Sequence, residues 1–401
     1  MSPQTFRLIL LISCAHGLVH VFELSLPSVE QMIDDEFDIG RDRSGILGTA
    51  WRLPFGVGAL FAGWLADRFG SKRMLLLYLG GCIATAWLSW WSPSLTILFI
   101  AMFAMGCFAS IYHPVGLSLI SRSTTPENRG MALGWHGILG SIGIAMAPFL
   151  AALVFRSDAM TWRQYYLALT IPAAAIGAAL FFLMTDDDPT EGEPNLTQAT
   201  DTTADDNSCW SAFFLLVTIG AMSGFIYGAF MHFLPRYLST TGMRPSGIST
   251  ESFRNYLAAL VLLFSVAGQA IAGKIARPGR LEFLLSVIMF GSATALVWVA
   301  QAEGAARLWS TCTLALIFFM MQPVYNSLIA QYVPPARRSV GYGFSNMICF
   351  GIGALGPTYA GLMRNDQWTY GGLAVIAAIA GLVAIALMSP ARRCTCSKVH
   401  Y

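Results

Sequence analysis

The chain has 401 residues, of which 55% are apolar and only 11% are charged, and its formal net charge is +2. Soluble globular proteins carry about 25% charged residues, so this composition excludes a soluble enzyme and indicates a polytopic membrane protein. The small net charge gives no indication of a nucleic-acid partner. Runs of about 17–25 apolar residues can cross the hydrocarbon core. Twelve such runs are expected, at 6–29, 43–66, 74–91, 95–121, 130–155, 163–184, 209–235, 253–275, 281–300, 307–332, 339–362 and 369–389.

The distribution of lysine and arginine predicts the orientation of these spans. Basic residues gather in alternate loops, among them the loop with Lys72 and Arg73 and the loop with Arg337 and Arg338. The positive-inside rule therefore places both termini in the cytoplasm. Residues 185–208 are acidic and poor in apolar side chains, which is typical of a flexible linker. We expect a six-helix bundle at 1–184, this cytoplasmic linker, a second bundle at 209–389 and a cytoplasmic tail at 390–401.

The two halves of the chain repeat each other. His113-Pro114-Val115 aligns with Gln322-Pro323-Val324, and Pro148 aligns with Pro357. Two halves of like topology indicate parallel repeats about an axis along the membrane normal, with a binding site between them near the midplane. Pro114 and Pro323 should each bend their span, because proline removes a backbone donor.

Ionisable side chains inside the membrane are the first candidates for function, because they are costly to bury. His16, His20 and Glu23 are spaced so that they share one face of the first span. Arg52 on the second span reaches a similar depth, so we expect it to pair with Glu23. A carboxylate beside an arginine and two imidazoles can take up and release protons, which proton coupling requires. The alternatives are a static buried salt bridge and a divalent-metal site; the sequence shows no clear fourth ligand, so no metal site is predicted.

Other polar residues fall on the spans that should surround a central cavity. These candidate substrate-cavity residues are Tyr112, His113, His136, Tyr227, His232, Gln322, Tyr325, Asn326 and Asn346. Together with Arg52, the histidines give a partly cationic cavity that favours an anionic solute.

A short polar hairpin links the second and third spans. It contains Gly63, Leu65, Asp67, Arg68, Gly70, Lys72 and Arg73. This pattern resembles the loop signature of the major facilitator superfamily, with Ser71 where a basic residue is usual. The resemblance implies an all-α polytopic fold of twelve transmembrane helices in two parallel six-helix repeats. It also implies that the hairpin gates the cytoplasmic side through Asp67, for which Arg338 is one candidate partner. His16 and His20 with Tyr112-His113-Pro114 look locally similar to the fosmidomycin-resistance exporter branch of the family.

These observations predict a secondary active transporter that moves a small organic, anionic solute by alternating access. Proton-coupled efflux is favoured, because Gly134 and Gly143 on the fifth span resemble an antiporter pattern. The alternatives are proton-coupled uptake of a small organic anion, a divalent-metal transporter and a non-transporting membrane sensor. We find no nucleophile–base set for an enzyme and no nucleotide-binding loop, so we expect no cofactor and a proton gradient as the driving force. The expected setting is a bacterial cytoplasmic (inner) membrane, with a small-molecule substrate and the lipid bilayer as partners, no nucleic acid and a monomeric state.

Overall fold

The computed structural model describes residues 1–156, 160–184, 209–334 and 337–389. Every regular element in these ranges is an α-helix. Helices satisfy all their backbone hydrogen bonds internally, which is the requirement that hydrocarbon imposes on a spanning segment. Among the described residues, eleven helical segments are long and apolar enough to cross a membrane, and three of these segments contain a break of one or two residues. The span expected at 339–362 does not appear among them; it forms two shorter helices that follow each other end to end, α14 (Arg338–Gly353) and α15 (Gly356–Leu362).

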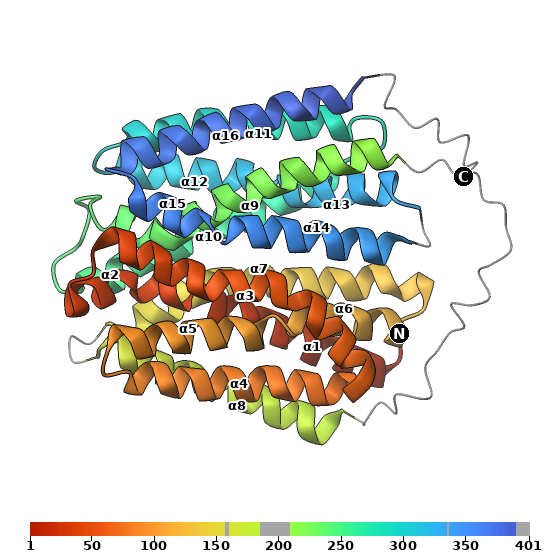
Figure 1. Cartoon of the computed structure of the whole chain (residues 1–401), viewed down its shortest axis with the longest axis horizontal. Helices are drawn as coiled ribbons and strands as arrows, with labels where there is room; N and C mark the ends of the chain where they lie inside the picture. The colour runs from red at the N-terminus through yellow and green to blue at the C-terminus, as the bar shows by residue number, and fades with distance from the viewer. Residues whose placement is uncertain (157–159, 185–208, 335–336, 390–401) are drawn as a thin grey trace, which may run out of the picture.

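The helices gather into two groups (Figure 1). The first group, coloured red to yellow-green, comprises α1 (Pro3–Glu23), α2 (Ser25–Phe37), α3 (Gly40–Phe69), α4 (Ser71–Trp91), α5 (Leu95–Ala109), α6 (Tyr112–Ser123), α7 (Pro126–Val154) and α8 (Trp162–Leu183). The second group, coloured green to blue, comprises α9 (Trp210–Leu238), α10 (Thr250–Ile275), α11 (Leu281–Gln301), α12 (Ala306–Phe319), α13 (Met321–Tyr332), α14, α15 and α16 (Asp366–Leu387). The expected linker 185–208 and tail 390–401 lie outside the described residues.

Four spans are broken close to a proline. The helix preceding Pro27 ends at Glu23, and the helix preceding Pro114 ends at Ala109. The helix preceding Pro323 ends at Phe319, and the helix preceding Pro357 ends at Gly353. Each of these helices ends four or five residues before the proline. In a continuous helix the proline ring would clash with the carbonyl four residues earlier, and that carbonyl would have no N–H partner. The bends expected at Pro114 and Pro323 are therefore present. Pro148 lies inside the continuous helix α7, so the repeat is not symmetric at this position.

The two groups are joined by ion pairs at the end of the molecule remote from the start of α1 and the end of α16, which we call the closed end. Arg236 on α9 binds Glu30 and Asp34 on α2, at 2.8 and 2.6 Å. Asp366 on α16 binds Arg41 on α3 at 3.0 Å and also accepts from Arg307 on α12 at 3.1 Å. The acidic stretch 30–42, which lies between the first two expected spans, is mostly helical, since α2 runs to Phe37 and α3 begins at Gly40. Its acidic side chains therefore hold the two groups together.

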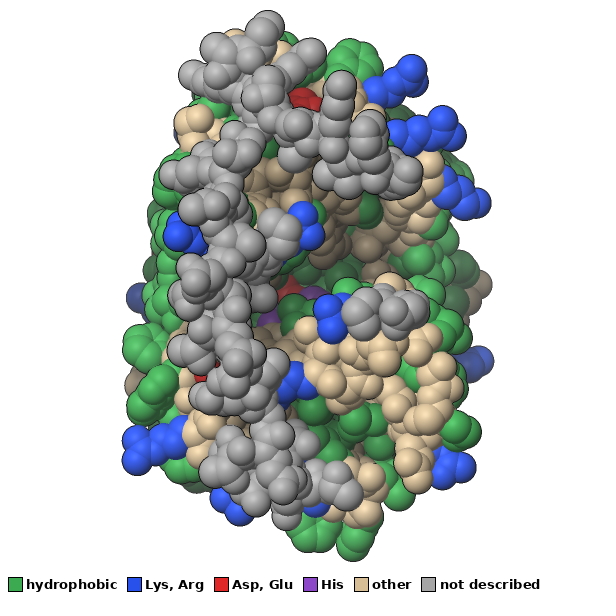
Figure 2. Space-filling view, turned by 90° about the vertical axis from the view of Figure 1, so that its right-hand side faces the viewer, with side chains coloured by type: hydrophobic (Ala, Val, Ile, Leu, Met, Phe, Trp, Pro, Cys, Tyr) green, Lys and Arg blue, Asp and Glu red, His purple; other side chains and the backbone are tan. Residues whose placement is uncertain are grey.

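The opposite end, where α1 begins and α16 ends, is hollowed between the two groups. Figure 2 looks at this end and shows a depression in the middle of the face, with histidine and acidic side chains visible inside it. The hydrogen bonds that join the two groups extend from the closed end to the middle of the molecule, where Ser141 on α7 donates to Gln269 on α10 at 3.3 Å. The molecule is thus closed at one end and open at the other.

Candidate functional site

Glu23 is the centre of the candidate site. It is the last residue of α1 and only 2% exposed. Its Oε1 accepts from Arg52 Nη1 at 2.8 Å, and its Oε2 lies 2.7 Å from Nδ1 of His20. The structure thus brings together the carboxylate, the arginine expected at the same depth and the histidine expected on the same helix face. Removing one partner of such a buried pair generally costs about 3–5 kcal/mol, because the other charge is left buried and uncompensated.

Arg52 has hydrogen-bonding capacity that the protein does not use. Its Nη2 is buried and has no hydrogen-bond partner among the described residues. Its guanidinium carbon lies 5.1 Å from the centre of the Tyr227 ring on α9, which belongs to the second group of helices. Arginine presents its donors in a planar fork that suits a carboxylate or sulfonate. A buried donor at the interface between the two groups is therefore free to bind an anionic group.

Four histidines lie beside this pair. The rings of His16 and His136 stack at 3.7 Å between centroids, and Nδ1 of His16 lies 2.7 Å from the backbone oxygen of His136. The His113 ring is 5.3 Å from that of His16 and 5.6 Å from that of His20. His113 comes from the first turn of α6, directly after the break between α5 and α6, and its Nε2 is buried without a partner among the described residues. Side chains from α1, α6 and α7 thus form one cluster of imidazoles.

Two phenylalanines cover the cluster from different groups of helices. Phe55 on α3 and Phe350 on α14 both pack on His113, with ring centroids at 5.6 and 6.2 Å, and they contact each other at 5.6 Å. The sequence analysis does not select either residue, because a phenylalanine in an apolar span carries no signal of its own. The aromatic contacts place the histidine cluster, like the charge pair, at the interface between the two groups.

Several residues expected to line the cavity instead join helices. The Tyr112 hydroxyl is fully buried and donates to the backbone oxygen of Ile12 at 2.6 Å. His232 lies at the closed end, where its Nε2 is 3.0 Å from the backbone oxygen of Ser44. The Tyr325 hydroxyl shares a 2.6 Å hydrogen bond with Ser345.

The remaining cavity candidates are less buried. The side chains of Gln322 and Asn326 are exposed, and that of Asn346 is half-buried. The backbone oxygen of Asn326 accepts a hydrogen bond from the Tyr342 hydroxyl at 2.8 Å. These positions on α13 and α14 are accessible, and none of their side chains has a hydrogen bond to the Glu23 cluster.

The polar hairpin between α3 and α4 takes the tight turn that its glycines predict. Gly70 ends α3 with a φ of 83°, a backbone conformation that glycine adopts without strain. Asp67 is exposed and forms no hydrogen bond or ion pair with another described residue. Arg338, its candidate partner, donates to the backbone oxygen of Val333 at 3.4 Å. The expected lock is therefore not formed here, which agrees with the hollow at this end of the molecule.

Comparisons with known proteins identify the family. The model of the Major Facilitator Superfamily matches residues 12–357. The chain belongs to this superfamily. It is therefore a multi-pass membrane transporter and not an enzyme, as the hairpin signature, the helix pattern and the missing nucleophile–base set predict. The expected class of fold, an all-α polytopic membrane protein, is confirmed by the helices described above.

The individual relatives are distant. The chain is 22% identical over 378 residues to the probable sulfoacetate transporter SauU of Cupriavidus necator, covering 86% of each chain. It is also 22% identical over 369 residues to multidrug resistance protein D of Escherichia coli, covering 88% of this chain and 89% of the relative. Among solved structures, a bacterial homologue of the human lysosomal transporter Spinster, in an inward-facing and occupied conformation, matches with a TM-score of 0.77 at 14% identity, over 96% of this chain and 97% of that one. This last likeness concerns the fold alone.

Proposed function

We propose that the protein is a proton-coupled symporter of a small organic anion. The proposal rests mainly on one observation: Arg52 holds Glu23 with one nitrogen, while its other terminal nitrogen is buried and finds no hydrogen-bond partner in the described part of the chain. A buried cationic donor facing the interface of the two groups is suited to a carboxylate or sulfonate. The name of the Cupriavidus relative supports this class of solute, because sulfoacetate carries one group of each kind.

The geometry links the proton to the anion. While Glu23 is ionised, it neutralises Arg52. A proton that reaches Glu23 through His20, whose Nδ1 is 2.7 Å away, removes that negative charge and leaves the whole guanidinium to the solute. When Glu23 loses the proton, it pairs with Arg52 again and displaces the anion. Proton and anion therefore bind together and leave together, which is symport.

Alternating access follows from the two ends of the molecule. The Lys and Arg distribution puts the termini, and with them the hollow of Figure 2, on the cytoplasmic side. The conformation is then inward-facing, with the ion pairs of Arg236 and Asp366 closing the outer side. Rocking of the two helix groups about the Glu23 site would open that side and close the other, as in transporters built from repeats. In the setting proposed, a bacterial inner membrane, the proton gradient would drive uptake.

Proton-coupled efflux, the direction favoured by the sequence, is the second candidate. Phe55, Phe350 and Tyr227 give the site aromatic surfaces that suit a hydrophobic compound, and one relative is named as a multidrug resistance protein. In an exchanger the substrate and the proton would compete for Glu23. The two candidates therefore differ in whether proton and solute move in the same direction.

Purified protein in proteoliposomes under an imposed pH gradient tests both candidates. The internal pH is followed with a trapped dye while small carboxylates, sulfonates and antimicrobial compounds are added. We expect an added anion to carry protons in its own direction. Glu23→Gln should abolish this proton movement while still exchanging labelled solute for unlabelled solute, and Arg52→Gln should lose solute binding.

The matched control is Glu36→Gln, because Glu36 pairs with Arg163 and its side chain is 40% exposed, away from the site. This variant should behave as the wild type. Proton movement opposite to the solute would establish efflux by exchange instead of symport. Wild-type proton coupling in Glu23→Gln would remove Glu23 from the mechanism, leaving it as a structural partner of Arg52.

A further inference from the structure

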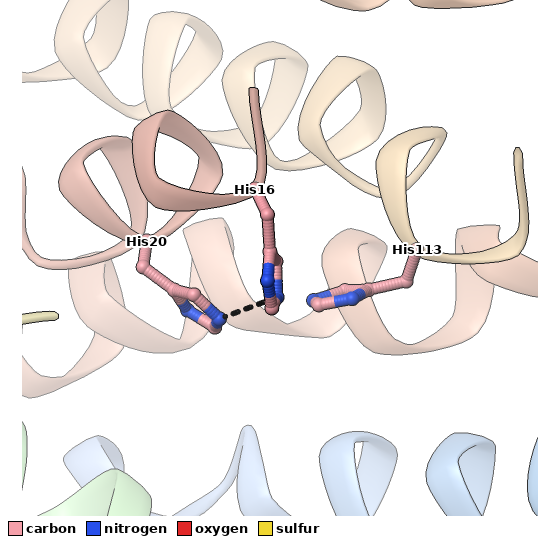
Figure 3. A group of neighbouring side chains, drawn as sticks. All are labelled: His16, His20 and His113. Atoms are coloured by element: carbon pink, nitrogen blue, oxygen red, sulfur yellow. Dashed lines mark hydrogen bonds between the residues drawn. The ribbon is translucent and has the colours of Figure 1, made fainter. Parts of the chain in front are cut away.

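Three imidazole rings converge on one point inside the molecule. His16 and His20 on α1 and His113 on α6 turn their rings toward one another (Figure 3). One ring nitrogen of each lies within 4.8 Å of the other two. The closest pair is Nε2 of His20 and Nε2 of His16, at 3.2 Å. Three histidines that meet in this way offer nitrogen ligands from two helices to a single small ligand.

The hydrogen bonds behind two of these rings fix which nitrogen carries hydrogen. Nδ1 of His16 lies 2.7 Å from the backbone oxygen of His136, and a carbonyl oxygen can only accept, so this Nδ1 is the donor. Nδ1 of His20 lies 2.7 Å from the Glu23 carboxylate and donates to it in the same way. In both neutral rings the lone pair is then on Nε2. The 3.2 Å contact thus sets two lone pairs against each other, an arrangement that a cation between them would stabilise.

The third ring supplies a further unused nitrogen. Nε2 of His113 is buried and has no hydrogen-bond partner among the described residues. His113 stands on the first turn of α6, beside the break that Pro114 imposes, so its ring can adjust without bending a continuous helix. Zinc binds imidazole nitrogen at about 2.0–2.1 Å, which puts two nitrogens of a tetrahedral site about 3.3–3.4 Å apart. The distance of 3.2 Å between the Nε2 atoms of His16 and His20 already fits this geometry. The widest separation between ligand nitrogens, 4.8 Å, needs to shorten by about 1.5 Å.

We propose that His16, His20 and His113 form a binding site for a divalent transition-metal ion. Imidazole ligands select Zn²⁺, Co²⁺, Ni²⁺ or Cu²⁺ over Ca²⁺ and Mg²⁺, which require oxygen ligands. The carboxylate behind His20 and the carbonyl behind His16 are the outer partners that usually orient metal-binding histidines. Three protein ligands leave one tetrahedral position open. The structure therefore supplies, in His113, the additional ligand that is not evident in the sequence.

The site shares His20 with the proposed proton path, but its ligands include neither Glu23 nor Arg52. The Glu23 charge is already balanced by Arg52, so the three rings act as neutral ligands, and the bound ion adds positive charge to the same cavity. An anionic solute could then occupy the open coordination position. Metal binding itself needs neither a proton gradient nor a solute, so it can be measured separately from transport.

Binding of Co²⁺ alone to the purified full-length protein tests the proposal. The protein carries a purification tag without histidine, and Cys394→Ser and Cys396→Ser remove the two cysteines of the tail sequence. Co²⁺ in a tetrahedral nitrogen site gives visible absorption bands, and equilibrium dialysis gives the stoichiometry. We expect about one equivalent per chain, displaced by Zn²⁺ and not by Mg²⁺.

Substitution of a ligand should weaken this binding at least about tenfold. His113→Gln is the main variant, because His113 makes no hydrogen bond whose loss could unfold the protein, and His20→Gln is the second. His232→Gln is the matched control, since His232 is also a histidine inside the molecule but lies at the closed end beside Ser44. Absence of Co²⁺ binding to the wild type would overturn the proposal. The short contact between His16 and His20 would then be explained by a proton shared between the two rings. Equal binding by the wild type and by both ligand variants would also overturn it.

Discussion

Removal of Arg236 should open the closed end. Arg236 donates through Nε and Nη2 to the two carboxylate oxygens of Glu30, at 2.9 and 2.8 Å, and through Nη2 to Asp34 at 2.6 Å. The Glu30 side chain is 2% exposed and also accepts from Ser44 at 2.5 Å. Arg236→Gln leaves this buried carboxylate without its counter-charge in the present conformation. Opening of the closed end would expose it to water.

The size of the effect follows from burial. Loss of one partner of a buried ion pair costs about 3–5 kcal/mol. The lower end applies here, because Glu30 keeps Ser44 as a donor and the Arg236 side chain is 18% exposed. About 3 kcal/mol changes the ratio of closed to open molecules roughly 150-fold toward open. Arg163→Gln is the matched control: its pair with Glu36 lies within the first group of helices, is more exposed, and contributes about 1 kcal/mol or less.

Spin labels at Asp35 on α2 and Thr240 beyond α9 can measure this ratio by pulsed dipolar spectroscopy, because both side chains are exposed at the closed end. We expect a single short distance in the wild type and in Arg163→Gln, and a second, longer distance in Arg236→Gln. Adding Asp366→Asn, which also removes the contacts to Arg41 and Arg307, should increase the longer population further. A double variant with the wild-type distance distribution would refute the assignment of these ion pairs to a gate.

Three further predictions concern residues singled out in the sequence. Tyr112→Phe should lower the free energy of unfolding by about 1 kcal/mol, measured by denaturation in detergent, and leave the apparent affinity for solute unchanged, because its hydroxyl binds backbone and not the cavity. Gly143→Val should destabilise the protein by about 1–3 kcal/mol or more, because a side chain there meets the backbone of α1, whereas Gly134→Val should be neutral, since nothing lies within 4 Å of its added Cβ. Asp67→Asn should leave thermal stability in detergent unchanged but slow transport in proteoliposomes. A lower stability would show that Asp67 already has a role in this conformation.

Much of the fold can be predicted from the sequence, because hydrocarbon permits few solutions. Apolar runs of sufficient length have to be helices, and prolines inside them have to bend or break them, as at Pro114 and Pro323. The break before Pro357 is harder to foresee, since the aligned Pro148 leaves its helix continuous. Whether a proline interrupts a helix depends on whether neighbouring helices satisfy the freed carbonyl, and that is a property of packing.

The site is predictable only where residues share one helix. The face of His16, His20 and Glu23 follows from their spacing, and the depth of Arg52 suggests its partner. His113 and Phe350 reach the cluster from other helices, and no local pattern indicates how close they come. The ion pairs of the closed end cannot be predicted from the sequence for a related reason. The acidic stretch after Val29 reads as a loop, although Glu30 and Asp34 share a helical face that meets Arg236 from the distant helix α9.

The charge pair and the closed end are carried by the same helices. Glu23 ends α1, and the next helix, α2, bears Glu30; Arg52 lies on α3, whose first turn bears Arg41. On the opposite side, α9 carries both Tyr227 beside Arg52 and Arg236 beside Glu30. A movement that separates α2 and α3 from α9 therefore breaks the ion pairs of Arg236 at the closed end and shifts Tyr227 away from Arg52 at the same time. Because these helices are stiff and packed against one another, opening of the closed end also changes the surroundings of Arg52 and Glu23. The proton coupling proposed above requires such a change, because Glu23 has to bind a proton on one side of the membrane and release it on the other.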